Sequence, residues 1–131
     1  MRRTRPASPP LHLADVPGGP PPGTLLCHLS DLPDHGGRAL AFRDHGGAEL
    51  RLLVQRLNGT IRVFENRCPH VGTPLNLFGE RFLNSDGTAL ICRTHGALFD
   101  PLSGRCVQGP CKGDFLREVA VTERNGALYS R

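Results

Sequence analysis

Two cysteine–histidine pairs constrain this chain more than any other feature. The first is Cys68–His70, which reads Cys-Pro-His, and the second is Cys92–His95, which reads Cys-Arg-Thr-His. Twenty-one residues separate His70 from Cys92. Each pair combines a soft thiolate with an imidazole, two side chains that bind transition metals in proteins. The sequence therefore predicts one metal site assembled from two loops, with the ligands Cys68, His70, Cys92 and His95.

Zinc is the main alternative metal for such a set of ligands, because it accepts two cysteines and two histidines in a tetrahedral site. A zinc finger, however, usually places both cysteines in one short motif and both histidines in the other. In this chain each motif is mixed. The mixed motifs favour an iron–sulfur cluster, and a structural zinc module remains the alternative.

The order C-x-H followed by C-x-x-H, with Gly96 directly after the last histidine, resembles the Rieske [2Fe–2S] family. The resemblance covers roughly residues 24–131 and is specific only around residues 68–75 and 92–110. It implies one [2Fe–2S] cluster in which two cysteines hold an inner iron and two histidines hold an outer iron near the surface. Cys68 and Cys92 would be the cysteine ligands, and His70 and His95 the histidine ligands.

Four positions near these motifs differ from the respiratory branch of the family. That branch carries an extra cysteine in each loop, and the two form a disulfide, whereas the matching residues here are Thr73 and Thr94. It also carries a serine and a tyrosine whose hydroxyls donate to the cluster, where this chain has Ala97 and Phe99. The chain is therefore similar to the soluble Rieske-type ferredoxins, and we expect a potential of about −150 to 0 mV, at the low end of the Rieske window.

Three cysteines and four histidines lie outside the two motifs, and the histidines lack a partner at ligand spacing. Cys27 is expected to be a small buried apolar residue. Cys106 and Cys111 flank a loop that the resemblance places over the cluster; their spacing allows a disulfide, whereas a cytoplasmic setting favours free thiols. The other histidines are interpreted as ordinary surface or turn residues: His12, His28, His35 and His45.

The first 23 residues differ in composition from the rest of the chain. They contain 7 of its 12 prolines and no aromatic residue. Such a segment buries too little apolar surface to offset the entropy lost on ordering. We therefore expect residues 1–23 to form a flexible tail, and residues 24–131 to form one domain.

Charge and hydropathy exclude several classes of function. The net charge is +4, from 16 basic and 12 acidic residues, without a basic cluster or an aromatic stacking platform in the folded part. These features argue against nucleic-acid binding. Arg2 and Arg3 are followed by prolines rather than an apolar stretch, so an export signal is not expected. No run approaches the roughly 20 apolar residues of a membrane helix. The sequence thus predicts a cytoplasmic protein without membrane association.

Short strands separated by turns dominate the folded part, and no segment longer than a turn keeps a helical apolar period. The Asn58-Gly59 pair is a strong hairpin signal. We expect an all-β fold: an antiparallel β-sandwich base built from both ends of the domain, with a small cluster-binding lobe inserted at about residues 67–111. The expected strands are 24–28, 38–43, 50–57, 60–66, 81–83, 89–92, 116–122 and 127–130, with a turn or helical cap at 30–32.

The function expected from the resemblance is one-electron transfer between protein partners. The chain would take an electron from a reductase and pass it to a terminal oxygenase or a similar enzyme. The sequence offers no carboxylate–histidine triad for a mononuclear catalytic iron, so catalysis is expected to take place on the partner. An alternative is a small redox subunit of a larger reductase, similar to the small subunit of nitrite reductase.

Overall fold

Nine short strands form three antiparallel sheets in the computed structural model, which describes residues 8–69, 72–76 and 81–131. The first sheet has the order β1-β9-β8, the second β2-β3-β4 and the third β5-β6-β7. Helical structure in the described residues is limited to two short 3-10 turns, so the prediction of an all-β fold is confirmed. In chain order the elements are η1 (Leu13–Asp15), β1 (Leu25–His28), η2 (Leu29–Asp31), β2 (Gly36–Arg43), β3 (Glu49–Leu57), β4 (Thr60–Glu65), β5 (Leu90–Ile91), β6 (Leu98–Phe99), β7 (Cys106–Gln108), β8 (Val121–Arg124) and β9 (Ala127–Ser130).

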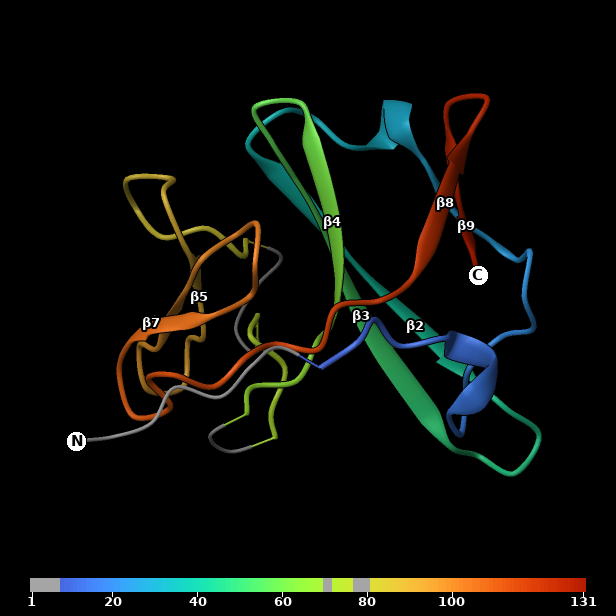
Figure 1. Ribbon diagram of the computed structural model, residues 1–131, viewed down its shortest axis with the longest axis horizontal. Coiled ribbons are helices and arrows are strands. Elements are labelled where there is room, and N and C mark those ends of the chain that lie inside the picture. Colours follow the sequence, from blue (N-terminus) through green and yellow to red (C-terminus); the bar gives the residue numbers. More distant parts are fainter. Residues whose placement is uncertain (1–7, 70–71, 77–80) are drawn as a thin grey trace.

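The first two sheets form the base, and the third belongs to a separate lobe (Figure 1). Strand β1 pairs with β9, so the base joins the beginning and the end of the domain. The core of the base is an apolar cluster that includes Leu26, Leu52, Val63 and Leu128. This arrangement is the predicted sandwich base with an inserted lobe.

Two hairpins of the base close with the turn that their sequences predict. Asn58 and Gly59 both have positive φ, of 52° and 78°. Asn125 and Gly126 repeat the pattern with 51° and 76°. Positive φ at both central residues defines the turn whose twist suits a two-residue hairpin, and Asn-Gly adopts it at low cost. The hairpins β3–β4 and β8–β9 are therefore fixed by local sequence.

Strand β3 contributes to two different cores. Leu52 and Val54 belong to the core of the base, whereas Leu53 belongs to the core of the lobe. Successive side chains of a strand point to opposite faces of the sheet. The apolar run Leu52–Val54 is therefore explained by burial on both faces, and β3 separates the base from the lobe.

The lobe leaves the base after β4 and returns beside it. The amide of Glu65 donates to the carbonyl of Arg117 at 2.8 Å, and an isolated bridge joins Phe64 to Glu118. Inside the lobe the predicted strands are shorter than expected: β5 covers only Leu90–Ile91, and residues 81–83 contribute a single bridge, from Leu83. Strands β6 and β7 were not predicted, and they are only two and three residues long.

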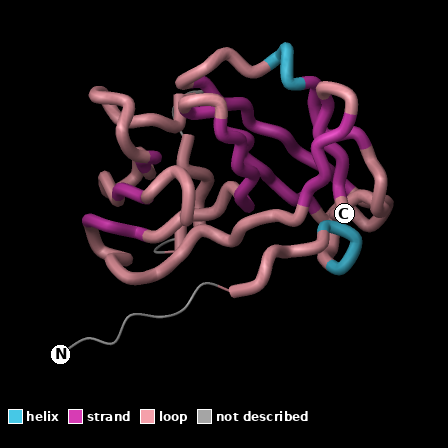
Figure 2. The backbone as a smooth tube through the Cα atoms, turned by 45° about the horizontal axis from the view of Figure 1, so that its top comes forward, coloured by secondary structure: helices cyan, strands magenta, loops and turns pink. Residues whose placement is uncertain are grey.

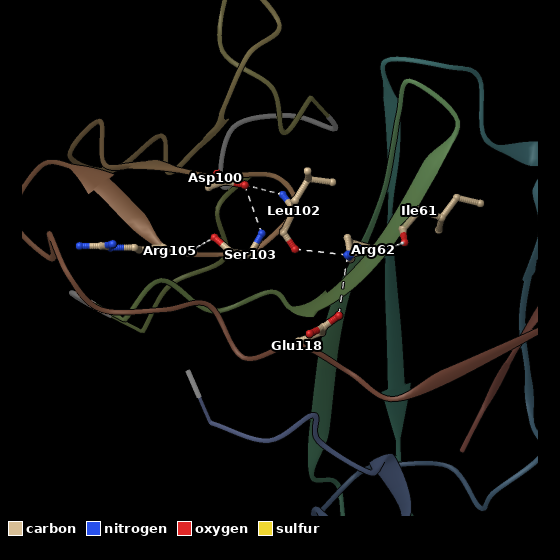
Figure 3. A network of polar contacts seen from close by, with 7 residues as sticks. All are labelled: Ile61, Arg62, Asp100, Leu102, Ser103, Arg105 and Glu118. Atoms are coloured by element: carbon tan, nitrogen blue, oxygen red, sulfur yellow. Dashed lines mark hydrogen bonds and ion pairs between the residues drawn. The ribbon is translucent and has the colours of Figure 1, made fainter. Parts of the chain in front are cut away.

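A polar network joins the lobe to the base at Arg62 of β4 (Figure 3). The Asp100 carboxylate accepts the amides of Leu102 at 2.7 Å and Ser103 at 3.1 Å, which fixes a turn of the lobe. The Arg62 Nε donates to the carbonyl of Leu102 at 3.2 Å and lies 3.9 Å from the Glu118 carboxylate. Arg62 therefore connects the turn to the segment that returns from the lobe.

Residues 8–23, the N-terminal segment, pack against the domain (Figure 2). Leu13 is fully buried in the core of the base. The amide of Leu11 donates to the carbonyl of Glu118 at 2.8 Å, and its carbonyl accepts the amide of Ala120 at 2.9 Å. The prediction of a flexible tail is thus wrong for residues 8–23. Burial of one leucine and backbone hydrogen bonds offset the entropy lost on ordering, and this loss is small because the prolines already restrict the backbone. Residues 1–7 lie outside the described residues.

Helices long and apolar enough to cross a bilayer are absent from the described residues.

Candidate metal centre

The two predicted metal loops contain the same hydrogen-bonded turn. In the first, the carbonyl of Cys68 accepts the amide of Gly72 at 2.7 Å; in the second, the carbonyl of Cys92 accepts the amide of Gly96 at 2.9 Å. Both glycines have positive φ, of 76° and 74°. A residue with a Cβ adopts this conformation only with strain. The sequence therefore builds two matching turns, each starting at a predicted cysteine ligand.

A second backbone bond closes each loop. The amide of Cys68 donates to the carbonyl of Thr73 at 2.8 Å, and the amide of Cys92 donates to the carbonyl of Ala97 at 2.9 Å. Both cysteines are therefore held at amide and carbonyl, which limits where their sulfurs can point. Each of the two predicted cysteine ligands is therefore held by the backbone of its own loop.

Direct contacts also join the two loops. The Thr73 and Thr94 hydroxyl oxygens lie 3.2 Å apart, within hydrogen-bond distance. The amide of Arg93 donates to the carbonyl of Leu75 at 3.0 Å, and the Arg93 guanidinium donates to the carbonyl of Leu83 at 3.3 Å. The loops are thus one unit, although 21 residues separate the two motifs.

Burial of the predicted ligands fits a Rieske cluster. Cys68 and Cys92 are each 1% exposed and belong to the same apolar cluster of the lobe. His95 is exposed. Buried thiolates and a surface imidazole are what an inner cysteine-bound iron and an outer histidine-bound iron require. His70, the remaining predicted ligand, lies outside the described residues.

Asn66 positions the first loop, a role that was not predicted from the sequence. This residue is 5% exposed, and its side-chain oxygen accepts the amide of Leu75 at 2.8 Å. Its side-chain nitrogen donates to Asn76 at 2.9 Å, while its own amide donates to the carbonyl of Arg51 in β3. Asn66 therefore ties both ends of the loop to the base. A polar residue directly after a strand and two residues before Cys68 was the available signal.

A third segment, residues 106–113, contains β7 and the turn after it and contacts the second metal loop; we call it the covering loop. A Cβ on Gly109 would lie 2.9 Å from the Cα of Ala97, so the covering loop rests directly on the second metal loop. Cys106 and Cys111 are free thiols with their sulfurs 3.1 Å apart. Burial raises the pKa of the Cys111 thiol, and its hydrogen bond with Cys106 raises it further.

The other cysteine and histidine positions agree with their expected ordinary roles. Cys27 is buried as a free thiol, and burial raises the pKa of its side chain. The four histidines outside the two motifs are all exposed, as expected: His12, His28, His35 and His45.

An open cleft of about 400 Å³ lies beside the first metal loop. Its lining includes Gly72 of that loop and the basic side chains of Arg43, Arg51 and Arg67. The Glu49 carboxylate bonds both Arg51 and Arg43, and these two bonds hold its pKa below the usual range. Three arginine side chains therefore lie next to the predicted centre, and two of them are paired with the same carboxylate, that of Glu49.

A scan of protein families matches residues 24–122 to the Rieske [2Fe-2S] domain. Among solved structures, the ferredoxin of Sphingomonas yanoikuyae B1 is 25% identical with a TM-score of 0.61, and the match covers 82% of this chain and 96% of that one. The ferredoxin of carbazole 1,9a-dioxygenase from Nocardioides aromaticivorans IC177 is 18% identical with a TM-score of 0.62, covering 84% and 97% of the two chains. The latter shows the fold alone.

Two further matches involve larger assemblies or enzymes. A complex of reduced oxygenase and oxidised ferredoxin in carbazole 1,9a-dioxygenase matches with 24% identity and a TM-score of 0.62, covering 81% of this chain and 89% of the matched chain. A cholesterol 7-desaturase of Caenorhabditis elegans is 29% identical over 83 residues. This match covers 59% of the present chain but only 19% of the desaturase.

Proposed function

Because the chain belongs to the Rieske [2Fe-2S] domain family, we propose that it is a one-electron carrier between a reductase and a terminal oxygenase. The cofactor of this family is one [2Fe–2S] cluster. The observation that carries the proposal is the pair of matching turns that bury Cys68 and Cys92 and leave His95 exposed. The chain acts as an electron-transfer component, and the catalytic step belongs to its partner.

We assign Cys68 and Cys92 to one iron, and His70 and His95 to the other. When bound, the cluster supplies a one-electron acceptor whose potential exceeds that of an all-cysteine cluster. The protein contributes the environment of that acceptor. The apolar lobe excludes water from the two sulfurs, and the exposed His95 places one ligand where a partner can approach.

The partner assignment is supported by the match to a ferredoxin bound to its oxygenase. Electron transfer needs the donor and acceptor centres close together, which favours docking on the face that carries His95. The cleft beside Gly72 lies next to the first metal loop. Its three arginines outnumber its two glutamates, Glu49 and Glu65, which would favour an acidic patch on the partner.

We place this carrier in the cytoplasm. The three cysteines outside the proposed ligand set, Cys27, Cys106 and Cys111, form no disulfide in the structure, a state that a reducing compartment maintains. Cell fractionation with an antibody against the chain tests this placement, and recovery from an oxidising compartment would contradict it.

Metal and sulfide analysis of purified protein tests the cofactor and its ligands. Protein from iron-replete cells should contain iron and acid-labile sulfide in equal amounts, two of each per chain, as a [2Fe–2S] cluster requires. Stoichiometric zinc without iron would instead support the zinc alternative.

A second assay tests the carrier function: the reduced protein should be reoxidised when a terminal oxygenase and its substrate are added. Fully loaded protein that no oxygenase or reductase partner can oxidise or reduce would overturn the carrier proposal.

A further inference from the structure

We propose that Cys106 and Cys111 form a redox-active dithiol, which closes to a disulfide when oxidised glutathione is in excess. Their Sγ atoms lie 3.1 Å apart, and the Cys111 thiol donates to the Cys106 sulfur. A disulfide bond is about 2.05 Å long, so closure requires the sulfurs to approach by only about 1 Å. Cys27 belongs to the core of the base, so it does not compete for either thiol.

The backbone of the covering loop already holds the two cysteines together. The amide of Cys106 donates to the carbonyl of Asp114 at 2.7 Å, and its carbonyl accepts the amide of Gly113 at 3.0 Å. The carbonyl of Cys111 accepts the amide of Asp114 at 2.9 Å. None of these bonds involves a sulfur, so disulfide formation leaves them intact.

Access to the pair depends on the short segment between the two cysteines. Residues 107–110 are all exposed, and Val107 is 47% exposed. Cys106 and Cys111 themselves are 0% and 2% exposed. We expect opening of this surface segment to expose the two sulfurs, because local openings need less free energy than global unfolding.

The reaction is two successive thiol–disulfide exchanges. The thiolate of one cysteine attacks a sulfur of oxidised glutathione, forms a mixed disulfide and releases one reduced glutathione. The second cysteine then attacks the protein sulfur of that mixed disulfide and releases another reduced glutathione. Two cysteine thiols are oxidised, one glutathione disulfide is reduced, and the two protons end on the two glutathione thiols.

The position of the pair connects it to the metal centre. The covering loop rests on Ala97, two residues after His95, through the close approach of Gly109. A disulfide between Cys106 and Cys111 would restrain this loop against the second metal loop. Iron should therefore leave the oxidised protein more slowly than the reduced protein when a chelator is added.

The test uses the cluster-loaded, full-length protein at equilibrium, because buried thiols exchange slowly. Samples are equilibrated in glutathione mixtures of rising oxidised fraction, quenched with acid, alkylated with N-ethylmaleimide and digested with trypsin. Cleavage after Arg105 and Lys112 gives a single peptide, residues 106–112, that carries both cysteines and no other. We expect this peptide to lose both adducts together and to appear two hydrogens lighter than the dithiol. The peptide that contains Cys27 should stay alkylated.

Two serine variants, Cys106→Ser and Cys111→Ser, serve as matched controls. Each leaves one thiol in the peptide, so neither should give the lighter peptide, and both should keep the visible spectrum of the parent. Two adducts on the parent peptide at the highest oxidised fraction, with the spectrum intact, would overturn the proposal. A link between Cys111 and Cys68 would overturn it as well, because it would mean that a released cluster ligand had reacted. Iron content, measured on the same samples, keeps this outcome separate from a failure of the electron-carrier proposal.

Discussion

The side chains of Thr73 and Thr94 meet across the two metal loops, with their hydroxyl oxygens 3.2 Å apart. The respiratory branch of the family places a disulfide at the matching positions. In this chain a neutral hydrogen bond joins the loops, and its strength does not depend on the redox state of the surroundings. The hydrogen bond keeps the loops together under reducing conditions, where a disulfide would be at risk.

Replacing either threonine by valine should remove this link between the loops. We expect each variant to lose about 0.5–1.5 kcal/mol of unfolding free energy and to release iron faster to a chelator. The double variant should lose little more unfolding free energy than either single variant, because each single substitution already removes the same hydrogen bond. Thr122→Val, on exposed β8, is the control and should match the parent. Fully additive losses would show that the hydroxyls act independently.

Asn66 should be more important to the first loop than any other uncharged polar residue near it. Asn66→Ala leaves the buried amide of Leu75 without its acceptor, and we expect a cost of about 1–3 kcal/mol in chemical denaturation. Asn76→Ala removes only the side-chain bond between the two asparagines and should cost less. Equal losses in the two variants would contradict the role assigned to the Leu75 amide.

Removal of the N-terminal segment should destabilise the domain. A chain that starts at Gly23 lacks Leu13, which is fully buried, and should lose at least the roughly 1.5–3 kcal/mol that burial of a leucine contributes. Leu13→Ala in the full chain should lower the free energy of unfolding by about 2–5 kcal/mol. His12→Ala, at an exposed neighbour, should change this free energy little. Thermal unfolding measures all three, and an unchanged midpoint for the truncated chain would show that the segment contributes nothing.

Changes at the proposed ligands should divide into two classes. Cys68→Ser and Cys92→Ser should abolish the cluster spectrum and loosen the lobe, because metal binding organises these loops. His70→Cys and His95→Cys should retain a cluster whose potential is lower, since a thiolate stabilises ferric iron. His45→Ala, in an exposed turn, is the control. A His95→Cys protein with an intact cluster and the potential of the parent would refute the assignment of that ligand.

The reduction potential should lie at about −150 to 0 mV, at the low end of the Rieske window. Ala97 and Phe99 are buried side chains that offer no hydroxyl donor. Restoring donors with Ala97→Ser and Phe99→Tyr should raise the potential by on the order of 100 mV. Phe42→Tyr, in the base, is the control for adding a hydroxyl elsewhere. Protein-film voltammetry measures the reduction potential of each variant. A parent potential above about +200 mV would mean that groups other than these two side chains determine the potential.

Local sequence was sufficient for the parts of the fold that local chemistry determines. The turns at Asn58-Gly59 and Asn125-Gly126 were predictable because few other residue pairs adopt positive φ twice in succession. The motifs around Cys68 and Cys92 likewise indicated two loops of one centre, and the structure shows both cysteines in one apolar cluster. The ligand roles of Cys68, His70, Cys92 and His95 all stay predictions, and His70 lies outside the described residues.

Long-range contacts account for what the sequence did not reveal. Leu13 lies in a proline-rich segment whose average composition suggests disorder, yet one side chain in the right place anchors it. Asn66 resembles any polar residue at a strand end, and its importance depends on Leu75 and Asn76 folding back onto it. Strands β6 and β7 are two and three residues long, too short for a period to be read.

The burial of β3 on both faces leaves this strand a single way to pair. Leu52 and Val54 fill the base while Leu53 fills the lobe, so a slip of one residue would exchange the side chains of two cores at once. Most half-buried strands incur that penalty on one face only. The β2–β3–β4 meander therefore resists misregistered intermediates, and its central amides should be the last to exchange with deuterated solvent, whether or not the cluster is bound.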